Sequence, residues 1–130
     1  MTRINIVPPA ELHAKHLVAE YRELPRIFAL ARAAHARGVR TETLGAPACY
    51  TLGKGHVIFF YDKLLFLAKR QRSLVDEMVA RGYAPKFTRT EELLDGIPPE
   101  WLNDWVPDEA ALVINRQRIA ERSVWNLPES

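Results

Sequence analysis

Apolar residues recur at helical spacing in two stretches of this chain, each of which predicts a main helix, and the residues that follow Pro107 predict a third. The first helix is expected from Pro9 to about residue 36, with apolar positions at Leu12, Leu17, Ala19, Ile27, Leu30 and Ala31. Pro9 suits the first turn of a helix because the N–H that it lacks would be unpaired there. Pro25 lies inside the pattern, so we expect the first helix to kink near residues 21–24. Gly38 is a suitable C-terminal stop.

The second helix is expected to begin near Asp62, with Asp62 or a nearby residue as its cap, and to end at Gly82. Its apolar stripe is Leu64, Leu67, Leu74, Val75 and Met78. Its polar side is predicted to carry Lys63, Lys69, Arg70 and Arg72. The third helix is expected to follow Pro107 and to run to about Arg122, with Asp108 and Glu109 favourable at its positive end.

The segments between these helices are predicted to be long loops. Glycines and prolines interrupt residues 39–62. The apolar run 56–61 has no second strand to pair with, so we expect buried irregular chain there. Residues 85–105 are also predicted to be loop, with one helical turn at residues 90–94 that Thr90 caps. The predicted fold class is all-α, with three main helices and long loops in a single compact domain of residues 1–130.

The composition indicates the cellular compartment in which the protein is expected. Residues 2–20 contain no apolar segment suited to a signal peptide, and no run is long enough to cross a membrane. The single cysteine, Cys49, has no partner for an internal disulfide, which is typical of a reducing compartment. We therefore expect a cytoplasmic protein without membrane contact, in which Cys49 is a small buried residue.

Charge is distributed unevenly along the chain. Residues 1–90 contain 15 Lys and Arg against 7 Asp and Glu, a net charge of +8. Residues 91–130 contain 3 against 9, a net charge of −6. A basic body with an acidic C-terminal third indicates a face that binds a polyanion, although solvated helix faces would show the same asymmetry.

The first helix places a carboxylate between two guanidinium groups. Glu23 follows Arg22 directly, and Arg26 lies three residues further on. At 100° per residue, His16 and Glu20 fall within about 60° of Glu23. Nearby positive charge favours the ionised carboxylate. The alternative interpretation is an ordinary surface ion pair, which contributes roughly 0–1 kcal/mol.

The N-terminus offers a nucleophile. Thr2 is small, so we expect Met1 to be removed and the α-amine of Thr2 to be free. The reference pKa of an α-amine is about 7.7–8.0, against about 10.4 for lysine, so much more of it is neutral at pH 7. Nearby arginines would lower that pKa further. Such an amine can attack an aldehyde-like carbon without deep burial.

Seven short segments combine these features: MTRIN (1–5), HL (16–17), AEYRELPR (19–26), LG (52–53), GHV (55–57), FFYDKL (59–64) and KRQ (69–71). Together they closely resemble the phage pyrimidine-dimer DNA glycosylase family, also called endonuclease V, nearly without gaps over about the first 80 residues. The likeness continues weakly through Pro107, Glu109, Ala110 and Arg118.

The resemblance implies an all-α DNA repair enzyme with two linked activities. The glycosylase breaks the glycosidic bond of the 5′ base of an ultraviolet-induced cyclobutane dimer. The lyase nicks the strand at the abasic site by β-elimination. The nucleophile implied is the α-amine of Thr2, which forms a Schiff base at C1′ of the deoxyribose. Glu23 is implied to stabilise positive charge on the sugar and to move protons.

The resemblance also implies the partner and the contacts. The partner is double-stranded DNA containing a lesion or abasic site, bound by a monomer that needs no metal or organic cofactor and is associated with the nucleoid when on DNA. The family kinks DNA and extrudes the base opposite the lesion. The basic residues expected to bind phosphate are Arg3, Arg22, Arg26, Arg118 and Arg122, with His16 near the imine.

Alternatives remain open at the level of sequence. The aromatic tail of the phage enzyme is missing after Trp125, so a lyase acting mainly on abasic sites is one alternative. A catalytically silent DNA-binding protein is a second, and an enzyme that uses its amine on another carbonyl substrate is a third. His13 and His16 have a spacing that suits a metal, but no Cys or carboxylate set completes a tetrahedral site.

Overall fold

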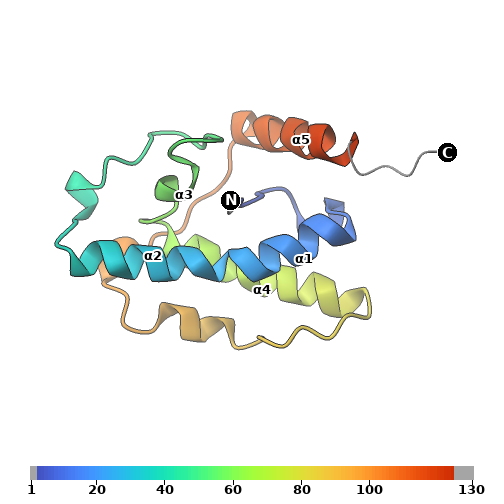
Figure 1. The fold of residues 1–130 in the computed structure, drawn as a ribbon, viewed down its shortest axis with the longest axis horizontal. Coiled ribbons are helices and arrows are strands. Elements are labelled where there is room, and N and C mark those ends of the chain that lie inside the picture. The colour runs from blue at the N-terminus through green and yellow to red at the C-terminus, as the bar shows by residue number, and fades with distance from the viewer. Residues whose placement is uncertain (1–2, 125–130) are drawn as a thin grey trace.

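The computed structural model describes residues 3–124, and in that range the chain forms helices and loops but no β-strand (Figure 1). The α-helices are α1 (Ala14–Glu23), α2 (Pro25–Ala36), α3 (His56–Phe59), α4 (Leu64–Ala80) and α5 (Glu109–Val124). Four short 3₁₀ helices lie at Pro9–Glu11, Thr41–Thr43, Thr90–Leu94 and Pro99–Trp101. The predicted all-α class is confirmed.

Pro25 divides the first predicted helix into α1 and α2, which continue nearly end to end (Figure 1). Since proline has no N–H, the carbonyl of Tyr21 lacks its helical donor. The side chain of Gln71 supplies one instead, donating from Nε2 to Tyr21 O over 3.0 Å. The predicted start was wrong, because Pro9 begins a separate 3₁₀ turn and α1 starts only at Ala14.

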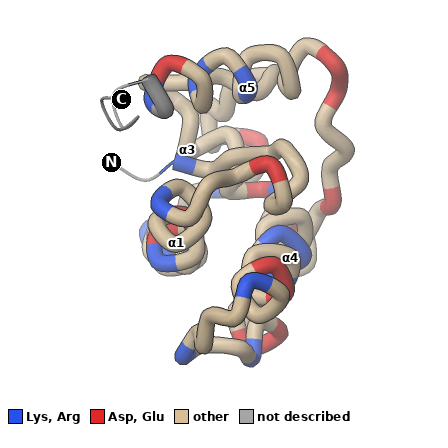
Figure 2. The backbone as a smooth tube through the Cα atoms, turned by 90° about the vertical axis from the view of Figure 1, so that its right-hand side faces the viewer, with Lys and Arg blue, Asp and Glu red and all other residues tan. Residues whose placement is uncertain are grey.

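The helices form two layers, and the N-terminal arm, which is the irregular segment of residues 3–8, lies between them. Helices α1 and α4 pack side by side, and α5 lies on the opposite side of the arm (Figures 1 and 2). Most of the apolar positions predicted for the first two helices face a shared core, but Leu30 was wrongly included because it is exposed. Its largest fully buried side chains include Trp101, Phe28, Phe59, Phe60, Leu17 and Leu67. This packing fixes the arm against three helices.

Several local predictions are corrected by the structure. Residues 56–59 form the short helix α3 rather than irregular chain. Gly55 permits this turn, because its φ is +89° and a Cβ there would lie 2.8 Å from Cγ of Pro47. Cys49 is exposed, not buried. The residues before α4 and before the turn at 90–94 are Lys63 and Arg89, so neither Asp62 nor Thr90 is the cap.

The predicted polar side of the second helix was wrong at one position, because Arg70 is buried while Lys69 and Arg72 are exposed. The start of the third helix was right: Asp108 Oδ1 accepts the N–H of Ala111 over 2.8 Å, as a capping carboxylate does. Within residues 3–124, no helix is long and apolar enough to cross a membrane.

Candidate active site

The buried residues of the N-terminal arm are held by side chains from several elements. Ile4 is bound through both of its backbone polar groups. Its N–H donates to Nε2 of His56 over 2.9 Å, and its carbonyl accepts the hydroxyl of Tyr50 over 3.1 Å. The other ring nitrogen of His56, Nδ1, lies 2.8 Å from the carbonyl of Thr51. These contacts fix the path of the arm next to Arg3.

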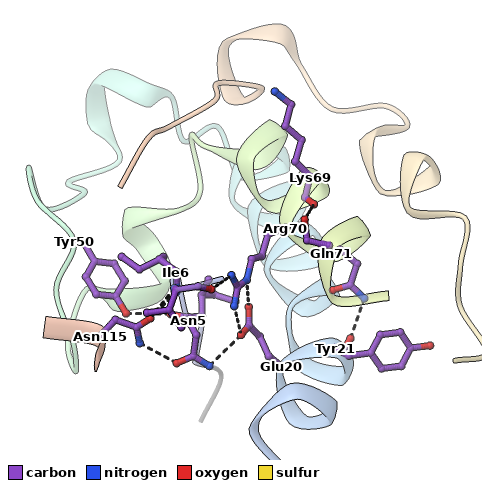
Figure 3. Close-up of polar contacts among 12 residues, drawn as sticks. Asn5, Ile6, Glu20, Tyr21, Tyr50, Lys69, Arg70, Gln71 and Asn115 are labelled. Atoms are coloured by element: carbon purple, nitrogen blue, oxygen red, sulfur yellow. Dashed lines mark hydrogen bonds and ion pairs between the residues drawn. The ribbon is translucent and has the colours of Figure 1, made fainter. Parts of the chain in front are cut away.

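A buried ion pair lies under the next residue of the arm. Arg70 of α4 donates from Nε to Oε2 of Glu20 over 2.8 Å and from Nη2 to Oε1 over 3.0 Å (Figure 3). Asn5 donates from Nδ2 to Oε1 of the same carboxylate over 3.0 Å. Arg70 also donates from Nη1 to the carbonyl of Val7. The carboxylate of Glu20 is therefore committed to holding the arm.

Helix α5 holds the arm from the other side through Asn115, which is fully buried. Its Oδ1 accepts the N–H of Ile6 over 2.7 Å and the N–H of Val7 over 3.1 Å. Its Nδ2 donates to Oδ1 of Asn5 over 2.9 Å (Figure 3). The arm thus ties α5 to α1, the two helices that carry most of the predicted site.

A cavity of about 390 Å³ opens beside this network, between the start of the arm, α1 and the C-terminal part of α5. Its charged and titratable lining residues are Arg3, His16, Glu20, Glu23, Arg118 and Arg122. Figure 2 shows Lys and Arg positions on α1, at the start of the arm and near the end of α5 on the same side of the molecule. Five of the predicted site residues are therefore brought together.

The cavity concentrates positive charge, and its Arg118 has an ion-pair partner in Glu121, with Nη1 of Arg118 lying 3.6 Å from Oε2 of Glu121. Burial and the nearby Arg118 and Arg122 lower the pKa of Arg3 from its ordinary value. Within the described part of the chain, Nη1 of Arg3 and Nε of Arg118 are buried without a hydrogen-bond partner. Buried N–H donors normally have an acceptor, and a bound anion would provide one for both arginines.

His16 is a neutral group at the edge of this charge. Burial lowers its pKa, and the neighbouring His13 and Arg3 lower it further. Its Nδ1 is buried and finds no partner among the described residues. The rings of His13 and His16 lie 4.1 Å apart, yet residues 3–124 contain no group of three His, Cys, Asp or Glu side chains that could hold a metal ion.

Arg22 and Arg26 are placed differently from the other predicted arginines. Both are exposed, and neither forms an ion pair with Glu23 within the described range. Arg22 borders a second cavity of about 390 Å³, whose other lining residues are Tyr21, Pro25, Phe87 and Leu93. The cations that share a cavity with Glu23 are instead those of the arm and α5. Thr2 lies outside the described residues.

The hydrogen bonds that hold the arm were not predicted from the sequence, although the positions of two of the residues that form them indicated a buried polar contact. Glu20 stands between Leu17 and Leu24 on the apolar face of the first helix, and Asn115 occupies a similar position after Ala111. A polar residue at a core-facing helical position requires a buried partner. His56 carried no such signal, because its partner is a backbone group 52 residues away.

Comparison with known families identifies the class of protein to which the chain belongs. The model of the family described as pyrimidine dimer DNA glycosylase matches residues 1–91. The chain belongs to this family. It is therefore a DNA repair glycosylase of the pyrimidine dimer class, with DNA as its substrate. The matched range contains the arm, α1 and α4, whereas α5, with Asn115, Arg118 and Arg122, follows it.

Proposed function

We propose that this pyrimidine dimer DNA glycosylase also cleaves the strand at the abasic site that it creates. The proposed intermediate is a Schiff base between the α-amine of Thr2, freed by removal of Met1, and C1′ of the damaged nucleotide. The observation that carries the proposal is the shared cavity of Arg3 and Glu23. Since Arg3 follows Thr2 directly, this cavity brings the neighbour of the amine to a carboxylate and a cluster of cations.

The proposed glycosylase and lyase reactions proceed through a fixed order of bond changes. The amine forms a bond to C1′ while the glycosidic bond breaks, and the base leaves with the bonding electrons and takes up a proton. The bond between C1′ and the ring oxygen O4′ then breaks, O4′ takes up a proton that the nitrogen gives up, and the opened sugar carries an imine at C1′. Loss of a proton from C2′ then breaks the C3′–O bond by β-elimination, and water releases the amine from the sugar fragment.

Glu23 is the carboxylate available for this work. Two carboxylates line the cavity, but Glu20 is held by Arg70 and Asn5. Glu23 is half-buried and has no ion-pair partner among the described residues. A carboxylate in that position can stabilise positive charge as it develops on the sugar and can accept the C2′ proton.

The cations of the cavity suit the DNA backbone. A phosphate near Arg3 and Arg118 would satisfy their buried unpartnered donors and relieve the repulsion that lowers the pKa of Arg3. His16, kept neutral by its lowered pKa, would transfer or position protons near the imine. Arg22 and Arg26 would contact phosphates outside the cavity, since both are exposed.

We infer that the second cavity receives a base extruded from the duplex. Tyr21, Phe87 and Leu93 line it with apolar surface, and Arg22 adds a guanidinium group. Bases stack favourably on aromatic rings and on arginine, and extrusion costs less at a damaged step, where pairing is already weak.

The test compares the protein with its Glu23→Gln variant on two substrates, DNA with a single cyclobutane dimer and DNA with a single abasic site. The proposal expects dimer cleavage and abasic-site nicking by the protein, and retained DNA binding without nicking by Glu23→Gln. Nicking of abasic DNA alone would favour a lyase with little glycosylase activity. Salt-dependent binding without any nicking would favour a silent DNA-binding protein.

A further inference from the structure

We propose that His56 is a positioning residue for the reacting amine. Its imidazole holds the backbone of Ile4, at the part of the arm that borders the cavity. This inference rests on the proposed Schiff-base mechanism. His56 does not line the cavity. Its effect on the reaction therefore passes through the arm, two residues from Thr2.

The contacts of His56 define one tautomer. Nε2 lies 2.9 Å from the Ile4 nitrogen and must accept, since the partner is an N–H donor. Nδ1 lies 2.8 Å from the Thr51 carbonyl and must donate. Only the neutral imidazole with its proton on Nδ1 meets both requirements. A protonated ring carries hydrogen on both nitrogens and cannot accept the N–H of Ile4.

The surroundings of His56 hold the neutral ring in place. Tyr50 packs edge-on at 5.5 Å and Phe60 at 5.7 Å, measured between ring centroids. Burial lowers the pKa of His56, and the charge of Arg3 lowers it further, while the hydrogen bond to Thr51 opposes them. Arg3 and the neutral phenol of Tyr50 are the titratable groups of the described residues that face the ring.

The tether length shows why this anchor matters. Ile4 is two residues from the amine of Thr2, a span of at most about 7 Å. Without that hydrogen bond, the nearest fixed backbone group is the carbonyl of Ile4, which accepts the hydroxyl of Tyr50 and allows the amine a span of at most about 10 Å. Because the volume that a tethered group explores grows with the cube of its reach, the effective concentration of the amine falls about threefold.

Two substitutions separate this role from simple support of the fold. His56→Phe keeps a ring against Tyr50 and Phe60 but removes the acceptor. His56→Gln keeps an acceptor oxygen at the end of a side chain of similar reach and removes the titrating ring. Val75→Ala is the matched control, since Val75 is a buried residue of α4 outside the core cluster that contains Ile4, and its loss of methyl groups lowers stability.

The experiment measures the rate of borohydride-trapped adduct with abasic DNA at saturating concentration, together with the DNA dissociation constant and the melting temperature. We expect His56→Phe to slow trapping about threefold with unchanged DNA affinity, and His56→Gln to recover most of the rate at pH 8. Val75→Ala should trap at the rate of the parent protein. As pH falls, the trapping rate of the parent protein should decrease more steeply than that of His56→Gln, because protonation of His56 slows only the parent protein.

The outcomes distinguish a failure of the positioning role of His56 from a failure of the Schiff-base mechanism. Equal trapping by the parent protein and His56→Phe, or an equal loss in Val75→Ala, would overturn the positioning role while leaving the Schiff base intact. A parallel acid dependence in His56→Gln would overturn it as well. Absence of any adduct with the parent protein would overturn the proposed lyase mechanism itself, and the positioning role with it.

Discussion

Arg70 and Glu20 form a two-pronged ion pair beneath the N-terminal arm, with N···O distances of 2.8 and 3.0 Å, and both side chains are at least 94% buried. The pair joins α4 to α1 and takes up one of the two carboxylates that line the candidate active site. Of the two glutamates on this face of α1, Glu20 therefore has a structural role, and Glu23 is the one that remains available for catalysis.

The first prediction concerns this ion pair. Arg70→Met should lower the free energy of unfolding by about 3–5 kcal/mol, because the carboxylate of Glu20 remains buried without its cation. Urea denaturation at pH 7 measures the change. Asp76→Asn is the control, since Asp76 pairs with Arg72 at 3.6 Å on the exposed side of α4 and should contribute less than about 1 kcal/mol. Similar losses in both variants would contradict the structural role of Glu20.

The second prediction concerns Asn115. Asn115→Leu removes the acceptor shared by the N–H groups of Ile6 and Val7 and leaves two buried donors unpaired. We expect a loss of about 2–6 kcal/mol in unfolding free energy, at about 1–3 kcal/mol for each orphaned donor. Val113→Ala, at an exposed position of the same helix, is the control and should change little. A variant as stable as the parent protein would show that α5 does not hold the arm through this side chain.

The third prediction concerns pH. Burial lowers the pKa values of His56 and His16, so the unfolded chain binds protons more readily than the folded one. Their stabilising contribution is complete above about pH 6.5, the unfolded value, and is lost as pH falls through the folded values. Urea titrations from pH 7.5 to 5 should show falling stability, with a smaller fall in His56→Gln. A flat profile over that interval would count against the buried neutral imidazoles.

The fourth prediction concerns the cations of α5. Arg118→Ala and Arg122→Ala should each weaken DNA binding and reduce the slope of log affinity against log salt by about one, because each is assigned one phosphate. Arg116→Ala is the matched control on the same helix, since Arg116 is paired with Glu11 at 3.0 and 3.1 Å outside the cavity. Fluorescence anisotropy over a salt series measures the slopes, and identical slopes in all three variants would exclude the assigned contacts.

The sequence was sufficient for the helices but not for what holds the arm. Apolar spacing located α4 closely, because this helix buries one face against the core, and Pro107 with the acidic residues after it located the start of α5. Helical spacing also placed His16, Glu20 and Glu23 on one face, and all three line the cavity. Local periodicity could not reveal that Arg70 reaches Glu20 across 50 residues or that Asn115 reaches Ile6 across 109, since these pairings depend on tertiary packing.

The arginines show the same limit of local reasoning. Neighbouring positions suggested that Arg22 and Arg26 flank Glu23, yet both point to solvent and Arg22 borders a different cavity. The cations that share a cavity with Glu23 come from the arm and from a helix almost a hundred residues later. Folding assembles this charge cluster from separate segments, which proximity in the sequence alone does not reveal.

The most direct test of the central claim is to map the covalent adduct. The protein is incubated with dimer-containing DNA in the presence of borohydride, and the cross-linked peptide is identified by mass spectrometry. The account predicts a reduced sugar remnant on the α-nitrogen of Thr2, in a peptide without Met1, and no adduct when Glu23 is replaced by Gln. An adduct on a lysine side chain, or none at all, would contradict it.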